Sequence, residues 1–219
     1  MSKLHKSLSI VVAAFAGSSA IAANPPTEQP PLYVALGVGY DAMPDRNLNY
    51  SSFAVSSQWS SGWGALLAMG YRAPNGLRGE VEYSTREARL KTFDNNFPWT
   101  GTQWDYSVMA NILYDFHFGW PVVPYIGAGI GGTHISWGDN FRNPQLPSIY
   151  DYESTHFGWQ GIVGASYDIN RNMELGVDFR IKGATAPYAF PGSQAGTFIN
   201  DFHYLTRSVF VTFRYGFNP

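Results

Sequence analysis

The sequence contains no cysteine, few charged residues and few long apolar runs. Its 219 residues contain no cysteine, which excludes disulfides and thiolate metal sites. Only 14% of the residues are charged, against roughly 25% in a typical soluble domain. The net charge of −2 leaves no basic stripe for nucleic acid. Because 16% of the residues are aromatic, the composition does not indicate a conventional water-facing surface.

The N-terminus has the layout of a secretory signal peptide over residues 1–22. Two lysines precede an apolar run at 8–16, and Ala20 and Ala22 form a small-residue cleavage signal. A membrane-spanning helix is the alternative, but this run falls short of the roughly 18 apolar residues that such a helix needs. Residues 23–31 are rich in proline and are predicted to form an irregular lead-in.

From residue 32 onward, apolar and polar residues alternate with a period of two, which indicates strands with two different faces. In 173–182, every odd position is apolar and most even positions are charged. No run after the signal peptide is long and apolar enough for a transmembrane helix. The pattern predicts eight strands, near residues 32–42, 62–72, 77–86, 103–117, 124–135, 156–169, 173–182 and 204–217.

The connections between these strands alternate in length. The short ones lie at 73–76, 119–121 and 170–172, and the long polar ones at 43–61, 87–102, 136–155 and 183–203. Short turns at one end and long loops at the other are typical of outer membrane barrels. We therefore predict an all-β fold for residues 32–217, an eight-stranded antiparallel up-and-down transmembrane β-barrel. A soluble β-sandwich is the alternative, because its strands also have one apolar face.

Two sets of residues favour the barrel. Charges of both signs on the polar faces are expected to pair across a narrow lumen, where four glycines would make room for them. The predicted lumen charges are Arg72, Arg78, Glu80, Glu82, Arg86, Asp105, Asp115, Glu174, Asp178, Arg180, Lys182 and Arg214, and the glycines are Gly64, Gly70, Gly164 and Gly176. Aromatic residues mark both ends of the apolar faces, as in the interfacial girdles of membrane barrels. The predicted girdle residues are Trp63, Tyr71, Trp104, Tyr114, Trp159, Tyr167, Tyr215 and Phe217.

Four segments resemble the eight-stranded outer membrane β-barrel superfamily, in particular its opacity-protein and surface-antigen group, related to the transmembrane domain of outer membrane protein A. These segments are 75–83, 110–116, 124–131 and 213–217. The resemblance runs from about residue 31 to the C-terminus. It implies surface-exposed long loops and offers no catalytic residues. The tail Asn218-Pro219 departs from the usual terminal aromatic residue, which would weaken the signal read by the insertion machinery.

One pair of residues raises the question of catalysis. His134 and Ser136 share a strand face at the rim, a spacing similar to that of lipid A deacylase barrels. Such a site needs a carboxylate to orient the histidine, and Glu153 and Asp139 lie at spacings that do not favour this role. We therefore expect no enzymatic activity, and a lipid A-modifying enzyme stays as an alternative. His134, His156 and His203 lack the spacing of a metal site, so no metal or cofactor is expected.

The lumen charges suggest a second alternative, a narrow porin or small-solute channel. Eight strands enclose an interior that side chains alone fill, so we favour a structural plug of salt bridges. The sequence thus predicts an outer membrane protein of a Gram-negative bacterium with a structural or adhesion- and antigen-like role. Its expected partners are membrane lipid, lipopolysaccharide, the insertion machinery and a host or surface ligand of the loops, with no nucleic acid. A monomer is expected.

Overall fold

The computed structural model describes residues 29–42, 46–49, 54–93, 101–137, 152–185 and 203–218. The predicted signal peptide and most of the predicted lead-in lie outside these residues. All the elements in the described part are strands. None of the described residues belong to a helix of the length and hydropathy that a membrane crossing needs.

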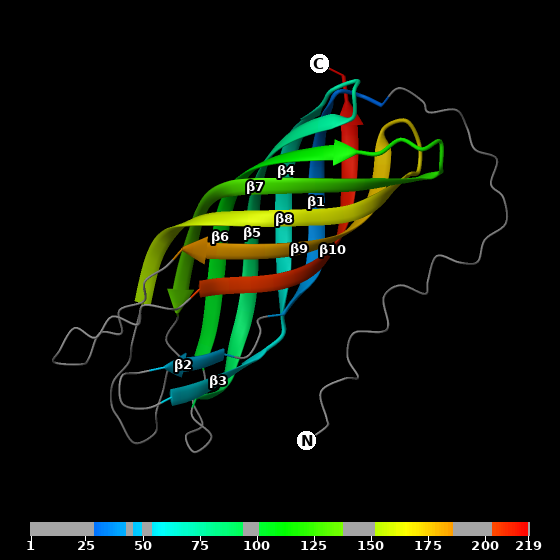
Figure 1. The fold of residues 1–219 in the computed structure, drawn as a ribbon. Coiled ribbons are helices and arrows are strands. Elements are labelled where there is room, and N and C mark those ends of the chain that lie inside the picture. Colours follow the sequence, from blue (N-terminus) through cyan, green and yellow to red (C-terminus); the bar gives the residue numbers. More distant parts are fainter. Residues whose placement is uncertain are drawn as a thin grey trace, which may run out of the picture.

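The strands form a single antiparallel sheet that closes on itself (Figure 1). They are β1 (Leu32–Ala42), β2 (Arg46–Asn49), β3 (Ala54–Ser60), β4 (Gly62–Arg72), β5 (Leu77–Phe93), β6 (Gly101–Asp115), β7 (Val122–Trp137), β8 (Tyr152–Asp168), β9 (Met173–Thr185) and β10 (His203–Phe217). The order β5-β4-β1-β10-β9-β8-β7-β6, together with the pairing of β5 with β6, makes a ring of eight strands. The prediction of a closed eight-stranded barrel is confirmed.

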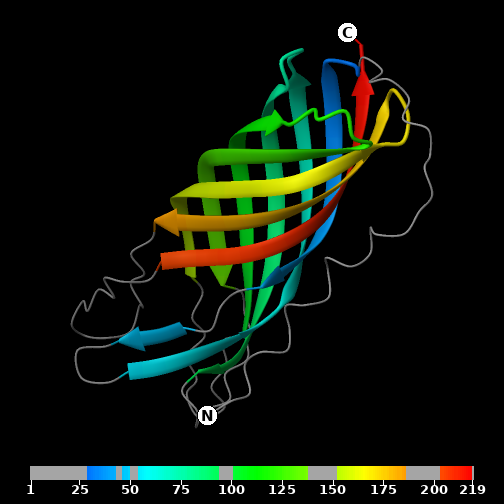
Figure 2. The ribbon, with the colours of Figure 1, turned by 45° about the vertical axis from the view of Figure 1, so that its right-hand side comes forward.

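The ring is closed by the first and last strands, which lie side by side in Figures 1 and 2. The ladder between β1 and β10 runs without interruption from Leu32 opposite Phe217 to Ala42 opposite Arg207. This pairing leaves no free edge in the barrel wall, so its backbone N–H and C=O groups are satisfied within the sheet. A sheet with this property is able to cross a hydrocarbon layer.

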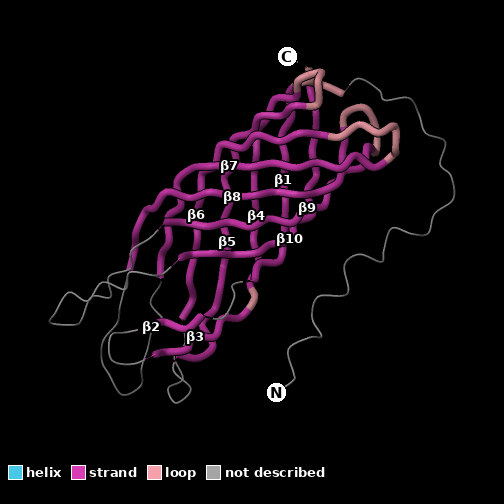
Figure 3. Tube along the Cα trace, in the orientation of Figure 1, coloured by secondary structure: helices cyan, strands magenta, loops and turns pink. Residues whose placement is uncertain are grey.

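The prediction that residues 43–61 form a loop is wrong, because this segment contains β2 and β3. The described β1–β4 pairing ends at Asp41 opposite Gly62, and β2 pairs with β3 in the same register, with Arg46 opposite Ser57. In Figure 3 the β2–β3 part extends past the barrel at the end opposite the C-terminus. The sequence hides this extension because its strands are polar and rich in serine.

Other strands also run further than predicted. β5 continues to Phe93, β8 begins at Tyr152, and β9 continues to Thr185. Parts of the predicted long loops 87–102, 136–155 and 183–203 are therefore strand. The remaining central parts of these loops lie outside the described residues.

Two of the short turns are held by asparagine side chains. In the β4–β5 turn, Asn75 Oδ1 accepts a hydrogen bond from the backbone N–H of Leu77 at 3.1 Å, and Gly76 has a φ of 86°, which glycine adopts without strain. In the β8–β9 turn, Asn170 Oδ1 accepts from the backbone N–H of Asn172 and of Met173, both at 2.9 Å. These local contacts explain why the chain reverses within so few residues.

The absence of cysteine allows a direct test of the closing seam. Val38→Cys with Val211→Cys places two outward-facing thiols directly opposite each other on β1 and β10. We expect oxidation to join them, because the geometry of opposed strand residues suits a disulfide. Without reductant, the boiled protein should then migrate as a covalent ring on electrophoresis.

The matched control is Val38→Cys with Phe213→Cys, in which the second thiol is on the same face but two positions out of register. This pair should stay unlinked under the same oxidation. Equal cross-linking of both pairs would contradict the register.

Candidate functional site

The outward face of the barrel is apolar and the inward face is polar, the reverse of a soluble protein. Val38, Val81 and Ile112 are 67%, 61% and 66% exposed, whereas the side chains of Arg78 and Lys182 are fully buried inside. A continuous exposed apolar face marks contact with a membrane or a partner. A solute that crossed the barrel would have to pass through its polar interior, so this interior is the candidate functional site.

The predicted girdle residues all lie on the outward face. At the long-loop end, the rings of Trp63 and Trp104 meet edge to face, with centroids 6.1 Å apart. The indole N–H of Trp63 donates to Glu87 Oε2 at 2.7 Å. Indoles with one apolar side and one hydrogen-bonded end suit the boundary of a bilayer.

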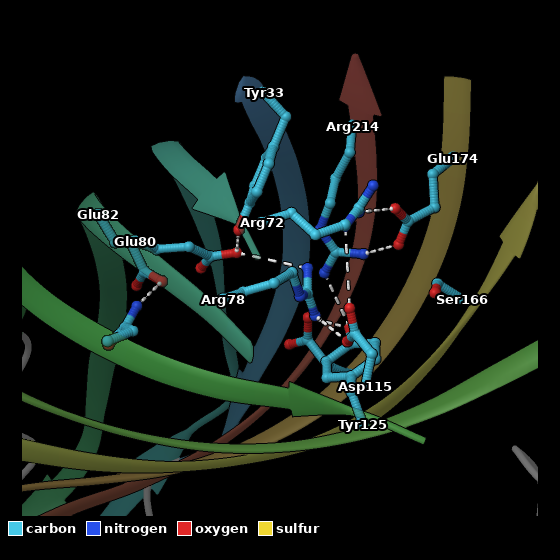
Figure 4. Close-up of polar contacts among 12 residues, drawn as sticks. Tyr33, Arg72, Arg78, Glu80, Glu82, Asp115, Tyr125, Ser166, Glu174 and Arg214 are labelled. Atoms are coloured by element: carbon cyan, nitrogen blue, oxygen red, sulfur yellow. Dashed lines mark hydrogen bonds and ion pairs between the residues drawn. The ribbon is translucent and has the colours of Figure 1, made fainter. Parts of the chain in front are cut away.

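The structure places the predicted lumen charges on the inward face, where they form connected clusters. The cluster nearest the short turns, here called the turn-side cluster, is drawn in Figure 4. Its members are Tyr33, Arg72, Arg78, Glu80, Asp115, Tyr125, Glu174 and Arg214. At its centre, Glu174 accepts from Arg72 at 2.6 Å and from Arg214 at 2.5 Å. One carboxylate thus joins two arginines from different strands.

The other half of the turn-side cluster is built around Arg78. This guanidinium lies 2.9 Å from Asp115 Oδ1 and 3.6 Å from Glu80 Oε1. Tyr33 O–H donates to Glu80 Oε1 at 2.6 Å. The Arg78 guanidinium also lies 4.9 Å from the centroid of the Tyr125 ring, a favourable cation–π distance. Among the described residues the guanidinium nitrogens of Arg78 make no hydrogen bond, so these ion pairs and the aromatic ring are what balance its buried charge.

A tyrosine connects the turn-side cluster to a second group in the middle of the lumen, here called the central group. Its members are Glu82, Asn111, Gln160, Asp178 and Arg180. Tyr125 O–H donates to Asp178 Oδ2 at 3.0 Å and accepts from Arg214 Nη2 at 3.0 Å. Asp178 in turn accepts from Arg180 Nε at 2.6 Å, and Arg180 also pairs with Glu82. These hydrogen bonds join the short-turn end to the centre of the barrel in one network.

Amides complete the central group. Asn111 Nδ2 donates to Glu82 Oε2 at 3.0 Å, and Gln160 Nε2 donates to Asn111 Oδ1 at 2.8 Å. All three side chains are buried. Because an ion pair in a low dielectric needs its remaining lone pairs satisfied, the two amides are part of what makes the central charges tolerable.

A separate group, here called the loop-side cluster, lies toward the long loops and consists of Asp41, Arg86, Asp105, Ser107 and Lys182. Lys182 Nζ donates to Asp105 at 2.5 and 2.7 Å and also bonds Ser107. Arg86 Nε lies 3.6 Å from Asp41 Oδ1. Among the described residues, no hydrogen bond or ion pair joins this cluster to the central group.

Phe210 lies at the junction of the loop-side cluster and the central group. Its side chain is fully buried, and the guanidinium groups of Arg86 and Arg180 lie 5.6 and 5.3 Å from its ring centroid. Glycines face the ring, since a Cβ on Gly39 or Gly64 would come within 2.8 or 2.9 Å of it. The ring therefore lies between two hydrogen-bonded networks.

Two small cavities lie at the short-turn end. They offer about 10 and 20 Å³, room for roughly one water each. Gln29, Arg72 and Glu174 line both. This part of the lumen is filled by side chains.

Sequence reasoning missed several residues of the lumen. They are Tyr33, Asp41, Asn111, Tyr125, Gln160 and Phe210. Strand parity could have found Asn111, which shares a strand face with the predicted charges Asp105 and Asp115. The strands β1, β7 and β8 carry no predicted charge, and Phe210 is an apolar residue on a polar face. The predicted role of the glycines was also incomplete, since Gly70 and Gly164 face the rings of Tyr33 and Tyr125 rather than only charged side chains.

The structure does not assemble the hypothetical deacylase site. His134 and Ser136 lie near the long-loop end, and His134 Nδ1 is 3.0 Å from Thr155 Oγ1. Glu153 is opposite Ser136 in the β7–β8 ladder, but among the described residues no hydrogen bond joins Ser136 to His134 or to Glu153. Asp139 lies outside the described residues. The described part of the chain also contains no group of three potential metal ligands.

Comparison with known proteins gives consistent matches. The family model described as "Outer membrane protein beta-barrel domain" matches residues 10–217. A curated outer membrane protein of Gluconacetobacter diazotrophicus is 29% identical over 174 residues, covering 69% of this chain and 46% of that protein. The chain thus spans about half the length of this relative.

Two solved structures are similar in fold. Neisserial surface protein A has a TM-score of 0.55 at 21% identity, over 85% of this chain and 97% of that one. OprG of Pseudomonas aeruginosa has a TM-score of 0.57 at 11% identity, over 88% of this chain and 98% of that one. At these identities the likeness concerns the fold alone.

The buried ion pair of the loop-side cluster yields a prediction for stability. Lys182→Met leaves the Asp105 carboxylate buried without its partner, which should lower the free energy of unfolding by about 3 kcal/mol. Urea titration of the protein folded in lipid vesicles measures this loss.

The double variant Lys182→Met/Asp105→Asn removes both charges and keeps a hydrogen-bond acceptor for Ser107, so it should recover most of the stability. If the double variant were as unstable as Lys182→Met alone, the loss would come from packing and not from the orphaned charge.

The filled lumen yields a prediction for conductance. The wild type should give no steady current in a planar bilayer, and neither should Phe210→Ala, because the turn-side cluster still fills the lumen when this ring is removed. The cavity should also cost about 3–5 kcal/mol, so folding is checked first by comparing unheated and boiled electrophoresis.

Phe213→Ala, on the outward face of the same strand, is the control and should remain silent. A steady current through the wild type, or through a folded Phe210→Ala barrel, would contradict a lumen filled by side chains.

Proposed function

The chain belongs to the outer membrane protein β-barrel domain family, and from this premise we propose that it is a closed barrel whose role is exercised by its long extracellular loops. That role is structural or of the surface-interaction kind, as in adhesion or surface-antigen proteins. The observation that carries the proposal is the contrast between a lumen filled by paired charges and an end enlarged by long connections.

The filled lumen supports a non-porin role. The buried pairs of Glu174 and of Arg180, together with the ring of Phe210, occupy the space through which a solute would move. Eight strands enclose an interior that side chains just fill. A diffusion channel for nutrients would therefore require many side chains to move together.

The long-loop end supports a role at the cell surface. In outer membrane barrels the longer connections are extracellular and the short turns are periplasmic. Here the hairpin of β2 and β3 and the extension of β5 continue the sheet past the barrel on one side. Loops carried on such a scaffold of paired strands suit recognition of a ligand at the cell surface.

We assign no catalytic role to the residues at the rim. His134 lies beside a threonine, and within the described ranges Ser136 has no hydrogen-bonded base that would activate its hydroxyl. The proposed role therefore needs neither cofactor nor metal. Membrane lipid and lipopolysaccharide surround the barrel, the insertion machinery is its assembly partner, and a monomer is sufficient for the role.

Removing the loops one at a time tests the proposal. Residues 138–151 or 186–202 are replaced by a short Gly-Ser linker, which leaves the ladders β7–β8 and β9–β10 intact. Cells that display the wild type should adhere to an array of glycans and extracellular-matrix proteins more strongly than cells that lack it, and at least one deletion should abolish the gain.

A control replaces the β4–β5 turn, 73–76, with Asn-Gly, which should leave adhesion unchanged because this turn is at the periplasmic end. Wild-type adhesion no greater than that of cells without the protein would refute the proposed surface role.

A further inference from the structure

The turn between β6 and β7 is unusually apolar for a solvent-exposed connection. Phe118 and Trp120 are 60% and 65% exposed, as much as the side chains in the middle of the outward face. His117 is the turn's one ionisable side chain. Gly119 has a φ of 75°, a conformation that glycine adopts readily and that lets the chain reverse here.

The aromatic rings of this turn form a continuous series that begins at the girdle. Tyr114 meets Phe116 edge to face, with centroids 5.0 Å apart. Phe116 stacks on Phe118 at 6.0 Å with an interplanar angle of 7°, and Phe118 lies 5.3 Å from Trp120. The apolar surface of the barrel wall therefore continues past the girdle without a break. We call Phe116, Phe118 and Trp120, together with Tyr114, the aromatic ladder.

The other described turns at the same end differ in composition. The β4–β5 turn is Ala73-Pro74-Asn75-Gly76, and the β8–β9 turn contains Asn170, Arg171 and Asn172. Their asparagines bond the backbone, as turns in water commonly do. The β8–β9 turn adds one apolar side chain, Ile169, which is 52% exposed and lies two residues after Tyr167, the partner of Val122 in the β7–β8 ladder. The apolar extension is thus confined to one side of the barrel.

We propose that the aromatic ladder inserts into the periplasmic leaflet of the membrane and anchors the barrel at the boundary between acyl chains and headgroups. The occupant of this surface is lipid, because the ladder continues the lipid-facing wall with no charged residue between them. Aromatic residues with large exposed faces prefer this boundary. Since only one turn carries the ladder, the barrel is held deeper in the bilayer on the β6–β7 side.

This inference rests on the membrane location of the barrel and not on the proposed surface role of the loops. Adhesion and anchoring are measured at opposite ends of the protein. A negative result for adhesion therefore does not contradict anchoring, and a negative result for anchoring does not contradict adhesion.

Fluorescence of Trp120 tests the proposal in the intact chain. Trp120→Phe keeps an aromatic ring in the ladder, so the difference between the wild type and this variant reports Trp120 alone. The proteins are folded into phosphatidylcholine vesicles with bromine at shallow or deep positions of the acyl chains. We expect Trp120 to be quenched more strongly by shallow bromine than by deep bromine. Absence of quenching at both depths would overturn the proposal.

A second measurement uses the lack of natural cysteines. Phe118→Cys and the control Pro74→Cys, in an exposed polar turn at the same end, are each labelled with an environment-sensitive dye. In the vesicles, the dye at position 118 should emit at shorter wavelength than the dye at position 74. Equal, water-like emission at both positions would overturn the proposal. So would emission that shifts only in native outer membranes, because a protein partner and not lipid would then cover the ladder.

Discussion

The requirement that every backbone N–H and C=O group find a partner without water governs this structure. A hydrocarbon layer offers no hydrogen bonds, so an open sheet edge inside it would cost several kcal/mol for each unpaired group. The ladders β1–β10 and β5–β6 remove the edges by closing the ring. Once the ring is closed, the alternation of side chains follows, because one face of every strand meets lipid and the other faces the lumen.

Closure creates a second constraint, since a narrow interior must be filled without voids. The chain fills it with ion pairs and aromatic rings in place of an aliphatic core. Glu174 bridges two arginines, Tyr125 links the turn-side cluster to the central group, and Phe210 lies between the central group and the loop-side cluster. Because a buried charge without a partner is costly, each charged side chain in the lumen requires a particular partner. Glycines at 39 and 64 are required because the ring of Phe210 occupies the space of their missing side chains.

The alternation of residues sufficed to predict the eight strands of the wall and the side on which Arg180 or Glu82 lies. It could not predict the partners of these residues, which depend on register around the ring. The position of Phe210 in the lumen was not predicted, because an apolar residue on a polar face breaks the pattern by which faces were assigned. The strands β2 and β3 were not predicted for another reason. Above the membrane both faces of a strand meet water, so alternation disappears while the backbone ladder continues.

The seam between β1 and β10 also sets the order of assembly. Every other neighbouring pair in the ring is joined by a local connection, whereas Leu32 and Phe217 lie at opposite ends of the barrel sequence. The entropy of closing a loop grows with its length, so hairpins form readily and the seam carries the largest entropic cost. On this argument we expect the pairing of the first strand with the last to be the final step. Until it forms, β1 and β10 each keep one edge without a partner, while their other edges pair with β4 and β9.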